Sequence, residues 1–128
     1  MVTIRADGLT LQGLVRQPYT PDPAITAALQ SFPVLVQSGA ASYSDEDGQT
    51  ARRTVLAQDK NGRLLFILAP YGGFTLAQLS QWLAASDLDL DFALNLDGGS
   101  STGLLLAGAV EAVPAFTLLP AVITVHAR

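Results

Sequence analysis

The stretch Phe92-Ala-Leu-Asn-Leu-Asp-Gly-Gly-Ser-Ser-Thr-Gly-Leu-Leu-Leu106 is the part of the chain from which the rest is best interpreted. An apolar run typical of a buried strand stops at Asp97, and Gly98, Gly99 and three hydroxyl residues follow before the apolar chain resumes. Glycines allow positive φ and let a ligand approach the main chain, while backbone N–H groups and hydroxyls in such a turn can bind an anion. A plain hairpin turn at Asp97-Gly98 is the structural alternative. Because a hairpin does not need three hydroxyls after its glycines, the excess polarity favours a binding site.

Upstream of this turn, the sequence pattern predicts a hairpin. Residues 53–58 alternate polar and apolar side chains, and residues 64–69 are continuously apolar. Between them lies Asn61-Gly62, a dipeptide that suits both central positions of a type I′ turn. Counting outward from that turn pairs Lys60 with Arg63 and places Arg53 opposite Pro70.

A helix is expected over residues 75–85. Thr75-Leu-Ala-Gln78 matches a capping box. The apolar residues that follow recur at helical spacing and include Trp82, which is therefore expected in the core rather than as a platform for a sugar.

The strand at 64–69, this helix and a strand at 92–96 make a β-α-β unit whose two strands should run parallel. Ligands bind beyond the carboxyl ends of such strands, which is where Asp97 lies. Arg53 is expected at the same end of the sheet. If the two parallel strands are neighbours, the backbones of Arg53 and Asp97 are roughly 10 Å apart.

The remaining segments complete an expected α/β (α+β) fold, a mixed sheet with one main helix packed on it, in a single domain over residues 1–128. Strands are predicted at 2–6 and 9–16 around Asp7-Gly8, at 32–37, at 104–107 and at 121–126, with a short helical piece at 24–30. The loop at 38–50 contains the consecutive acids Asp45, Glu46 and Asp47. These acids fit a solvated loop, and a mobile acidic loop bordering the site is the functional alternative.

Composition narrows the function classes. The chain is 49% hydrophobic and 14% charged, with a formal net charge of −4. It lacks the clustered Lys and Arg that nucleic acid or an anionic membrane surface requires, so neither is expected as a partner. No apolar run approaches the ~18 residues of a membrane helix and no signal peptide is evident, so no membrane insertion is expected and the compartment stays open. There is no cysteine and only one histidine, which excludes zinc-thiolate and multi-histidine metal sites. No metal site and no cofactor are expected.

At the signature turn, Ala93-Leu-Asn-Leu-Asp-Gly-Gly-Ser-Ser-Thr-Gly-Leu104 resembles the phosphodiester glycosidase family, the domain family of the lysosomal uncovering enzyme. The resemblance continues upstream in Arg53-Thr54, in Asp59-Lys-Asn-Gly-Arg63 and in Gly73-Phe-Thr-Leu-Ala-Gln-Leu79, in the family's order. It covers residues 33–106 and has no counterpart of an earlier Asn-Gly-Gly-Phe-type segment, so the chain resembles the C-terminal part of the domain.

The resemblance implies hydrolysis of a sugar-1-phosphodiester at the anomeric carbon. The substrate would be a small molecule or a polysaccharide that contains this linkage. A phosphomonoester leaves readily because its second pKa is about 6, so a cation can replace much of the work of a general acid. Arg53 suits that role, and Asp97 would act either as a base or as a stabiliser of an oxocarbenium-like transition state. The implied substrate-binding residues are Asn95, Gly98, Gly99, Ser100, Ser101 and Thr102.

Two other interpretations remain. Gly99-Ser-Ser-Thr-Gly103 fits a nucleophile-elbow pattern, which would make Ser101 an esterase nucleophile with His126 as its base. Alternatively, the chain is a non-catalytic or incomplete sugar-phosphate-binding module that needs a partner. Because its charge fraction is low for its size, exposed apolar surface and a homo-oligomer are expected in that case.

Overall fold

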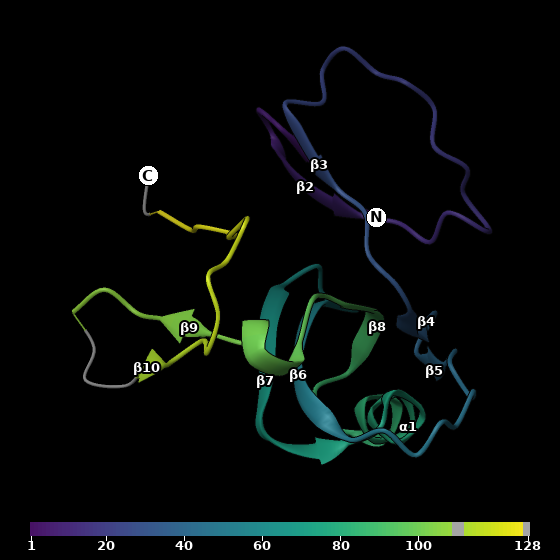
Figure 1. Cartoon of the computed structure of the whole chain (residues 1–128). Coiled ribbons are helices and arrows are strands. Elements are labelled where there is room, and N and C mark those ends of the chain that lie inside the picture. The colour runs from purple at the N-terminus through teal and green to yellow at the C-terminus, as the bar shows by residue number, and fades with distance from the viewer. Residues whose placement is uncertain (109–111, 127–128) are drawn as a thin grey trace.

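A five-stranded sheet with the strand order β5-β4-β8-β6-β7 forms the centre of the structure. The structure is a computed structural model that describes residues 1–108 and 112–126 (Figure 1). The strands of this sheet are β4 (Val34–Gln37), β5 (Ala40–Ala41), β6 (Ala51–Asp59), β7 (Leu64–Phe74) and β8 (Leu90–Asn95). Every paired strand in the described residues is antiparallel to its neighbour.

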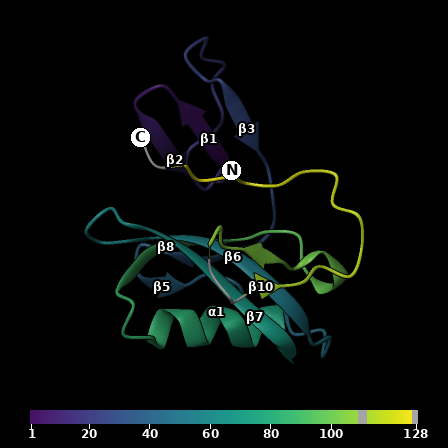
Figure 2. The ribbon, with the colours of Figure 1, turned by 90° about the vertical axis from the view of Figure 1, so that its left-hand side faces the viewer.

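The central sheet lies between two other layers (Figure 2). The helix α1 (Leu76–Ala85) covers one face, and a three-stranded sheet of β1 (Val2–Arg5), β2 (Gly8–Leu11) and β3 (Ala27–Leu29) covers the other. After β8 the chain forms a 3-10 helix, η1 (Gly99–Ser101), and a small ribbon of β9 (Leu104–Leu105) and β10 (Ala112–Val113). The α+β class is therefore confirmed. No helix in the described ranges is long and apolar enough to cross a bilayer.

Strand β6 shows why the sheet has two buried faces. Its side chains alternate between faces because a strand has a period of two. Val55 and Ala57 pack in the cluster beneath α1, whereas Leu56 packs with the N-terminal layer. All three are essentially inaccessible to solvent. Both faces thus need cover, and the helix and the N-terminal sheet supply it.

Helix α1 begins where the sequence predicts. Thr75 is the N-cap, its hydroxyl accepts a hydrogen bond from the backbone N–H of Gln78, and the Gln78 side chain accepts one from the backbone N–H of Thr75. Buried Ser80 donates its hydroxyl to the carbonyl of Leu35, 2.6 Å away, which joins the helix to β4. The predicted core position of Trp82 is wrong, because half of its surface is exposed (50%) and its ring lies against Phe74.

The hairpin of β6 and β7 has a different register from the predicted one. Arg53 pairs with Ala69 rather than Pro70. Within this turn, Gly62 has positive φ, at 82°, and Asn61 does not, so the turn is not type I′. The cause is Asp59, whose carboxylate accepts hydrogen bonds from the backbone N–H groups of Asn61 and Arg63 and so holds a turn of three residues.

The predicted β-α-β unit with two parallel strands is confirmed. Strands β7 and β8 run in the same direction, because β6 is antiparallel to both. They are not neighbours, however, since β6 lies between them. The residues that connect β7 to β8 form the helix, so the unit spans one intervening strand.

Two other predicted elements are wrong, and two predicted strands are shorter in the structure. The helical piece at 24–30 is instead β3, because Ala27 and Ala28 pair with β1. The predicted strand at 9–16 ends at Leu11. Residues 121–126 form no strand. The strand predicted at 104–107 is reduced to Leu104–Leu105.

Candidate active site

The signature turn lies against the start of β6. Leu96 donates its backbone N–H to the carbonyl of Thr54 (2.8 Å), which carries the chain past the last paired residue of β8. The next residues then cross the end of the sheet at Arg52 and Arg53. A Cβ on Gly98 would lie 2.7 Å from the carbonyl oxygen of Arg52, so only glycine allows this approach.

This arrangement brings Asp97 and Arg53 to one end of the sheet, as expected. Asp97 follows β8 and Arg53 lies on β6, so the two are one strand apart rather than two, because β8 pairs directly with β6. Asp97 is exposed, and its carboxylate accepts a hydrogen bond from the N–H of Gly98 (2.9 Å). The carboxylate of Asp97 has no ion pair within the described residues.

The backbone of the turn leaves fewer free donors than a full anion nest. The N–H groups of Ser101 and Thr102 donate to the carbonyls of Gly98 and Gly99 within η1. The N–H of Gly98 is taken by Asp97. In the described part of the chain, the N–H groups of Gly99 and Ser100 remain available, and Gly99 has positive φ at 61°.

Thr102 holds the turn in place. Its side chain is fully buried, and its hydroxyl accepts a hydrogen bond from the Thr54 hydroxyl on β6 (3.2 Å). The backbone N–H of Phe116 also donates to the carbonyl of Ser100 (2.7 Å), so the C-terminal segment lies against the turn. The turn is thus fixed from two sides.

Arg53 is oriented by two backbone carbonyls. Its Nε donates to Phe74 and its Nη2 to Gln49, at 3.3 and 2.8 Å. A guanidinium has five N–H donors, so the other three have no partner among the described residues. Arg53 therefore has a fixed orientation and spare N–H donors.

Arg52 is a residue that the sequence interpretation missed. Its guanidinium stacks on the ring of Phe116, 4.4 Å from the ring centre, and Nη2 donates to the carbonyl of Pro114. Its Nε and Nη1 are buried without a hydrogen-bond partner. Buried, unpaired N–H groups of a cation are costly and rare. No sequence signal separates Arg52 from its neighbour, because the distinction depends on the C-terminal segment that covers it.

Asn95 and Glu46 also lie near this end of the sheet. Asn95 pairs with Val55 and donates its side-chain amide to the carbonyl of Phe32, while its own side-chain oxygen is buried without a partner. Glu46 accepts a hydrogen bond from the hydroxyl of Thr75 (2.7 Å). Thr75 directly follows Phe74, whose carbonyl accepts from Arg53. The acidic loop is therefore tied to the first turn of α1.

Ser101 does not lie in a nucleophile elbow. That motif needs a strand, a sharp turn and then an α-helix, whereas Ser101 is the last residue of a 3-10 helix followed by the short β9. No hydrogen bond joins Ser101 to His126 in the described ranges. The esterase alternative has no support in this geometry.

Neither Asp97 nor Arg53 lines either of two hollows of the surface, although one of the hollows includes Ala69, which pairs with Arg53, and Phe74, whose carbonyl Arg53 contacts. One, of about 270 Å³, is lined by apolar residues of β7 and α1 that include Tyr71 and Trp82. The other is in the N-terminal layer. No group of three or more His, Cys, Asp or Glu side chains in the described residues is arranged to hold a metal ion.

The comparisons with known proteins agree with the signature turn. A family model described as phosphodiester glycosidase matches residues 2–125, which is more of the chain than the resemblance at 33–106 covered. Among curated proteins, none matches the chain significantly. Since the family model spans nearly all of the 128 residues, the chain belongs to the phosphodiester glycosidase family.

Proposed function

We propose that this chain hydrolyses a sugar-1-phosphodiester at the anomeric carbon and releases a free sugar and a phosphomonoester. In this reaction water adds to the anomeric carbon as the bond from that carbon to the phosphate oxygen breaks. The observation that carries the proposal is the close contact between the turn at Asp97-Gly98 and the start of β6. It brings an exposed carboxylate, Asp97, next to the strand residue Arg53, which has unused N–H donors.

The roles follow from charge. Arg53 presents a planar fork that matches two phosphate oxygens and stabilises the charge developing on the leaving group. Asp97 provides negative charge beside the anomeric carbon, where positive charge develops in the transition state. The free N–H groups of Gly99 and Ser100, with the hydroxyls of Ser100 and Ser101, would bind sugar or phosphate oxygens. Thr102 would position the turn, and Asn95 would orient the strand that ends at it.

Isotope labelling tests this reaction directly. The chain is incubated with a sugar-1-phosphodiester in water enriched in oxygen-18, and the products are followed by phosphorus NMR and mass spectrometry. We expect a phosphomonoester without label and a free sugar with label at the anomeric hydroxyl. Label in the phosphate would show cleavage of the P–O bond and would contradict a glycosidase mechanism.

A second candidate is a sugar-phosphate-binding module that needs a partner for catalysis. It is favoured by the exposure of Asp97 and by the absence of Asp97 from the walls of both hollows. Binding of a phosphodiester without turnover by the isolated chain, followed by turnover when a second polypeptide is added, would identify this candidate.

A further inference from the structure

A polar hollow of about 370 Å³ opens in the N-terminal layer, and nothing in the proposed reaction uses it. It lies between β1 and the loop that precedes β3. The two charged residues of its wall are Arg5 and Asp22, and polar side chains of Gln12, Gln17 and Tyr19 contribute to the rest. Ligand pockets commonly begin at about 300 Å³, so the volume suffices for one small ring.

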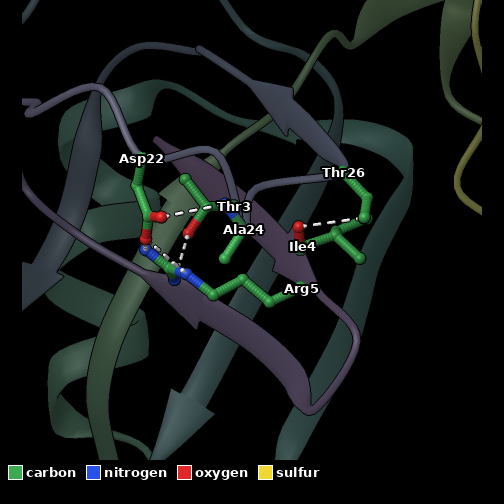
Figure 3. A network of polar contacts seen from close by, with 6 residues as sticks. All are labelled: Thr3, Ile4, Arg5, Asp22, Ala24 and Thr26. Carbon is green, nitrogen blue, oxygen red and sulfur yellow. Dashed lines mark hydrogen bonds and ion pairs between the residues drawn. The ribbon is translucent and has the colours of Figure 1, made fainter.

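Arg5 and Asp22 are fixed against each other (Figure 3). Nε and Nη2 of Arg5 both donate to Oδ2 of Asp22, at 3.2 and 3.1 Å. Nη1 donates to the hydroxyl of buried Thr3 (3.4 Å), and Oδ1 of Asp22 accepts the backbone N–H of Ala24 (2.9 Å). The N–H of Ala24, and then Arg5, hold the pKa of Asp22 below its usual value, so this carboxyl is ionised at neutral pH.

The loop that carries Tyr19 and Asp22 has little freedom. Pro18, Pro21 and Pro23 each restrict φ. The N–H of Ile25 closes a turn onto the carbonyl of Asp22 (3.1 Å). A wall that is ordered before binding loses less entropy when a ligand enters.

The chemistry of the wall selects an uncharged ligand rich in hydroxyls. An anion gains little here because Asp22 neutralises Arg5, and an apolar ligand would bury these polar groups without partners. Hydroxyl pairs can accept from the spare N–H groups of Arg5 and donate to Asp22 at the same time. Tyr19, with 48% of its surface exposed, offers a ring face, and no hydrogen bond engages the side-chain amide of Gln17 in the described residues.

We propose that this hollow binds one hexopyranose unit of a neutral glycan. The ring of Tyr19 packs on the face of the sugar, and the pair of Arg5 and Asp22 bridges two vicinal hydroxyls. The site is separate from the turn at Asp97, so this binding does not depend on hydrolysis.

NMR titration of the whole chain tests the site. Maltohexaose, cellohexaose and chitohexaose serve as neutral probes, and inorganic phosphate serves as an anionic one. With a fitting glycan we expect amide shifts centred on Arg5, Tyr19 and Asp22, with a dissociation constant in the roughly millimolar range typical of a shallow site. Asp97→Asn should bind that glycan equally well, which separates this result from the fate of the proposed reaction.

Two variants with matched controls sharpen the test. Tyr19→Ala should weaken binding about tenfold or more, whereas Tyr71→Ala, which removes an exposed tyrosine outside the hollow, should leave it unchanged. Arg5→Lys keeps the charge but loses the fork and should also weaken binding, whereas Arg16→Lys should not. Thermal unfolding and unchanged amide shifts outside the loop would show that each variant is folded.

Three results would overturn the proposal. The first is the absence of shifts at the hollow with all three glycans. The second is binding that survives both Tyr19→Ala and Arg5→Lys. The third is a stronger response of the hollow to phosphate than to any of the glycans, which would identify an anion site.

Discussion

Gly98 is the residue on which the geometry of the turn depends most clearly. Its φ is −138°, which any residue can adopt, so the requirement for glycine arises from space rather than from backbone conformation. The carbonyl of Arg52 occupies the position that a Cβ would need. This close contact sets the separation of Asp97 from the arginines of β6.

We therefore expect Gly98→Ala to push the turn off β6. The added methyl group should lower the free energy of unfolding by about 1–3 kcal/mol, as overpacking does, and reduce turnover by misplacing Asp97. Urea unfolding and a hydrolysis assay would measure the two effects. Gly73→Ala is the matched control, since nothing lies within 4 Å of a Cβ at Gly73. Equal effects at both positions would show that the contact with Arg52 is unimportant.

At the scale of the elements, helix α1 is tied to the site through its N-cap. Thr75 accepts from Gln78 and donates to Glu46, so one hydroxyl joins the helix to the acidic loop. Thr75→Ala should lower the free energy of unfolding by about 1 kcal/mol, whereas Thr75→Ser keeps both bonds and should retain most of that stability. Urea unfolding of the two variants measures the difference. If Thr75→Ser lowered the free energy of unfolding as much as Thr75→Ala, the effect would come from the lost methyl group rather than from the hydrogen bonds.

The hairpin of β6 and β7 contains a carboxylate whose ionisation supports folding. Burial raises the pKa of Asp59, but the hydrogen bonds from the side chain and backbone of Arg63 together lower the pKa by more than burial raises it. The folded pKa is therefore below the ordinary value of 3.8. A lowered pKa stabilises the fold above the unfolded pKa, and that stability is lost as pH falls through the folded pKa.

We thus expect the free energy of unfolding to fall as pH drops below about 4, and this acid dependence should be smaller in Asp59→Asn. Arg63→Gln removes the partner of Asp59 and should reduce the dependence in the same way. Urea unfolding between neutral pH and the acid range measures it. An unaltered acid dependence in both variants would contradict the role of this pair.

How much could be predicted from sequence also differs between elements. The capping box at Thr75 and the apolar stripe are local signals, so the helix was predicted with its correct bounds. The hairpin register depended on whether Asp59 or Asn61 shapes the turn, and a dipeptide pattern does not resolve that competition. The helical piece at 24–30 failed because pairing with β1, far away in sequence, outweighs the helix propensity of Ala27 and Ala28.

The same reasoning explains what could be predicted of the candidate site. The sequence predicts Asp97 and Arg53 at one end of the sheet, because Asp97 directly follows a strand and Arg53 begins the first strand of the predicted hairpin, opposite the carboxyl end of the second. The direct pairing of β6 with β8 was not predicted, because it joins segments that are far apart in the sequence. The environment of Arg52 was not predictable, because Pro114 and Phe116 reach it from 62 or more residues away in sequence.

For the molecule as a whole, exposed apolar surface predicts association. Val15, Tyr71 and Leu118 each expose more than nine-tenths of their surface, at 99%, 97% and 96%. In addition, β3 forms an open edge of the N-terminal sheet with all three residues exposed. Uncovered edges of this kind tend to pair with another strand.

We therefore expect the chain to self-associate at micromolar concentration through the β3 edge. Leu29→Lys adds a charge on that edge and should shift the chain toward monomer, whereas Val15→Lys, in a loop, should have a smaller effect. Light scattering measures the mass of each variant. A wild-type chain that is strictly monomeric would contradict the prediction.

The central claim is that the carboxylate at the end of β8 acts in hydrolysis of a sugar-1-phosphodiester, and the rate of Asp97→Asn tests it most directly. The change keeps the shape of the side chain and removes its charge. With the fold verified by its unfolding curve, we expect turnover to drop by about 10²–10⁴-fold, while Asp87→Asn, the same change at an exposed site after α1, should match the wild type. Wild-type turnover in Asp97→Asn would contradict the account.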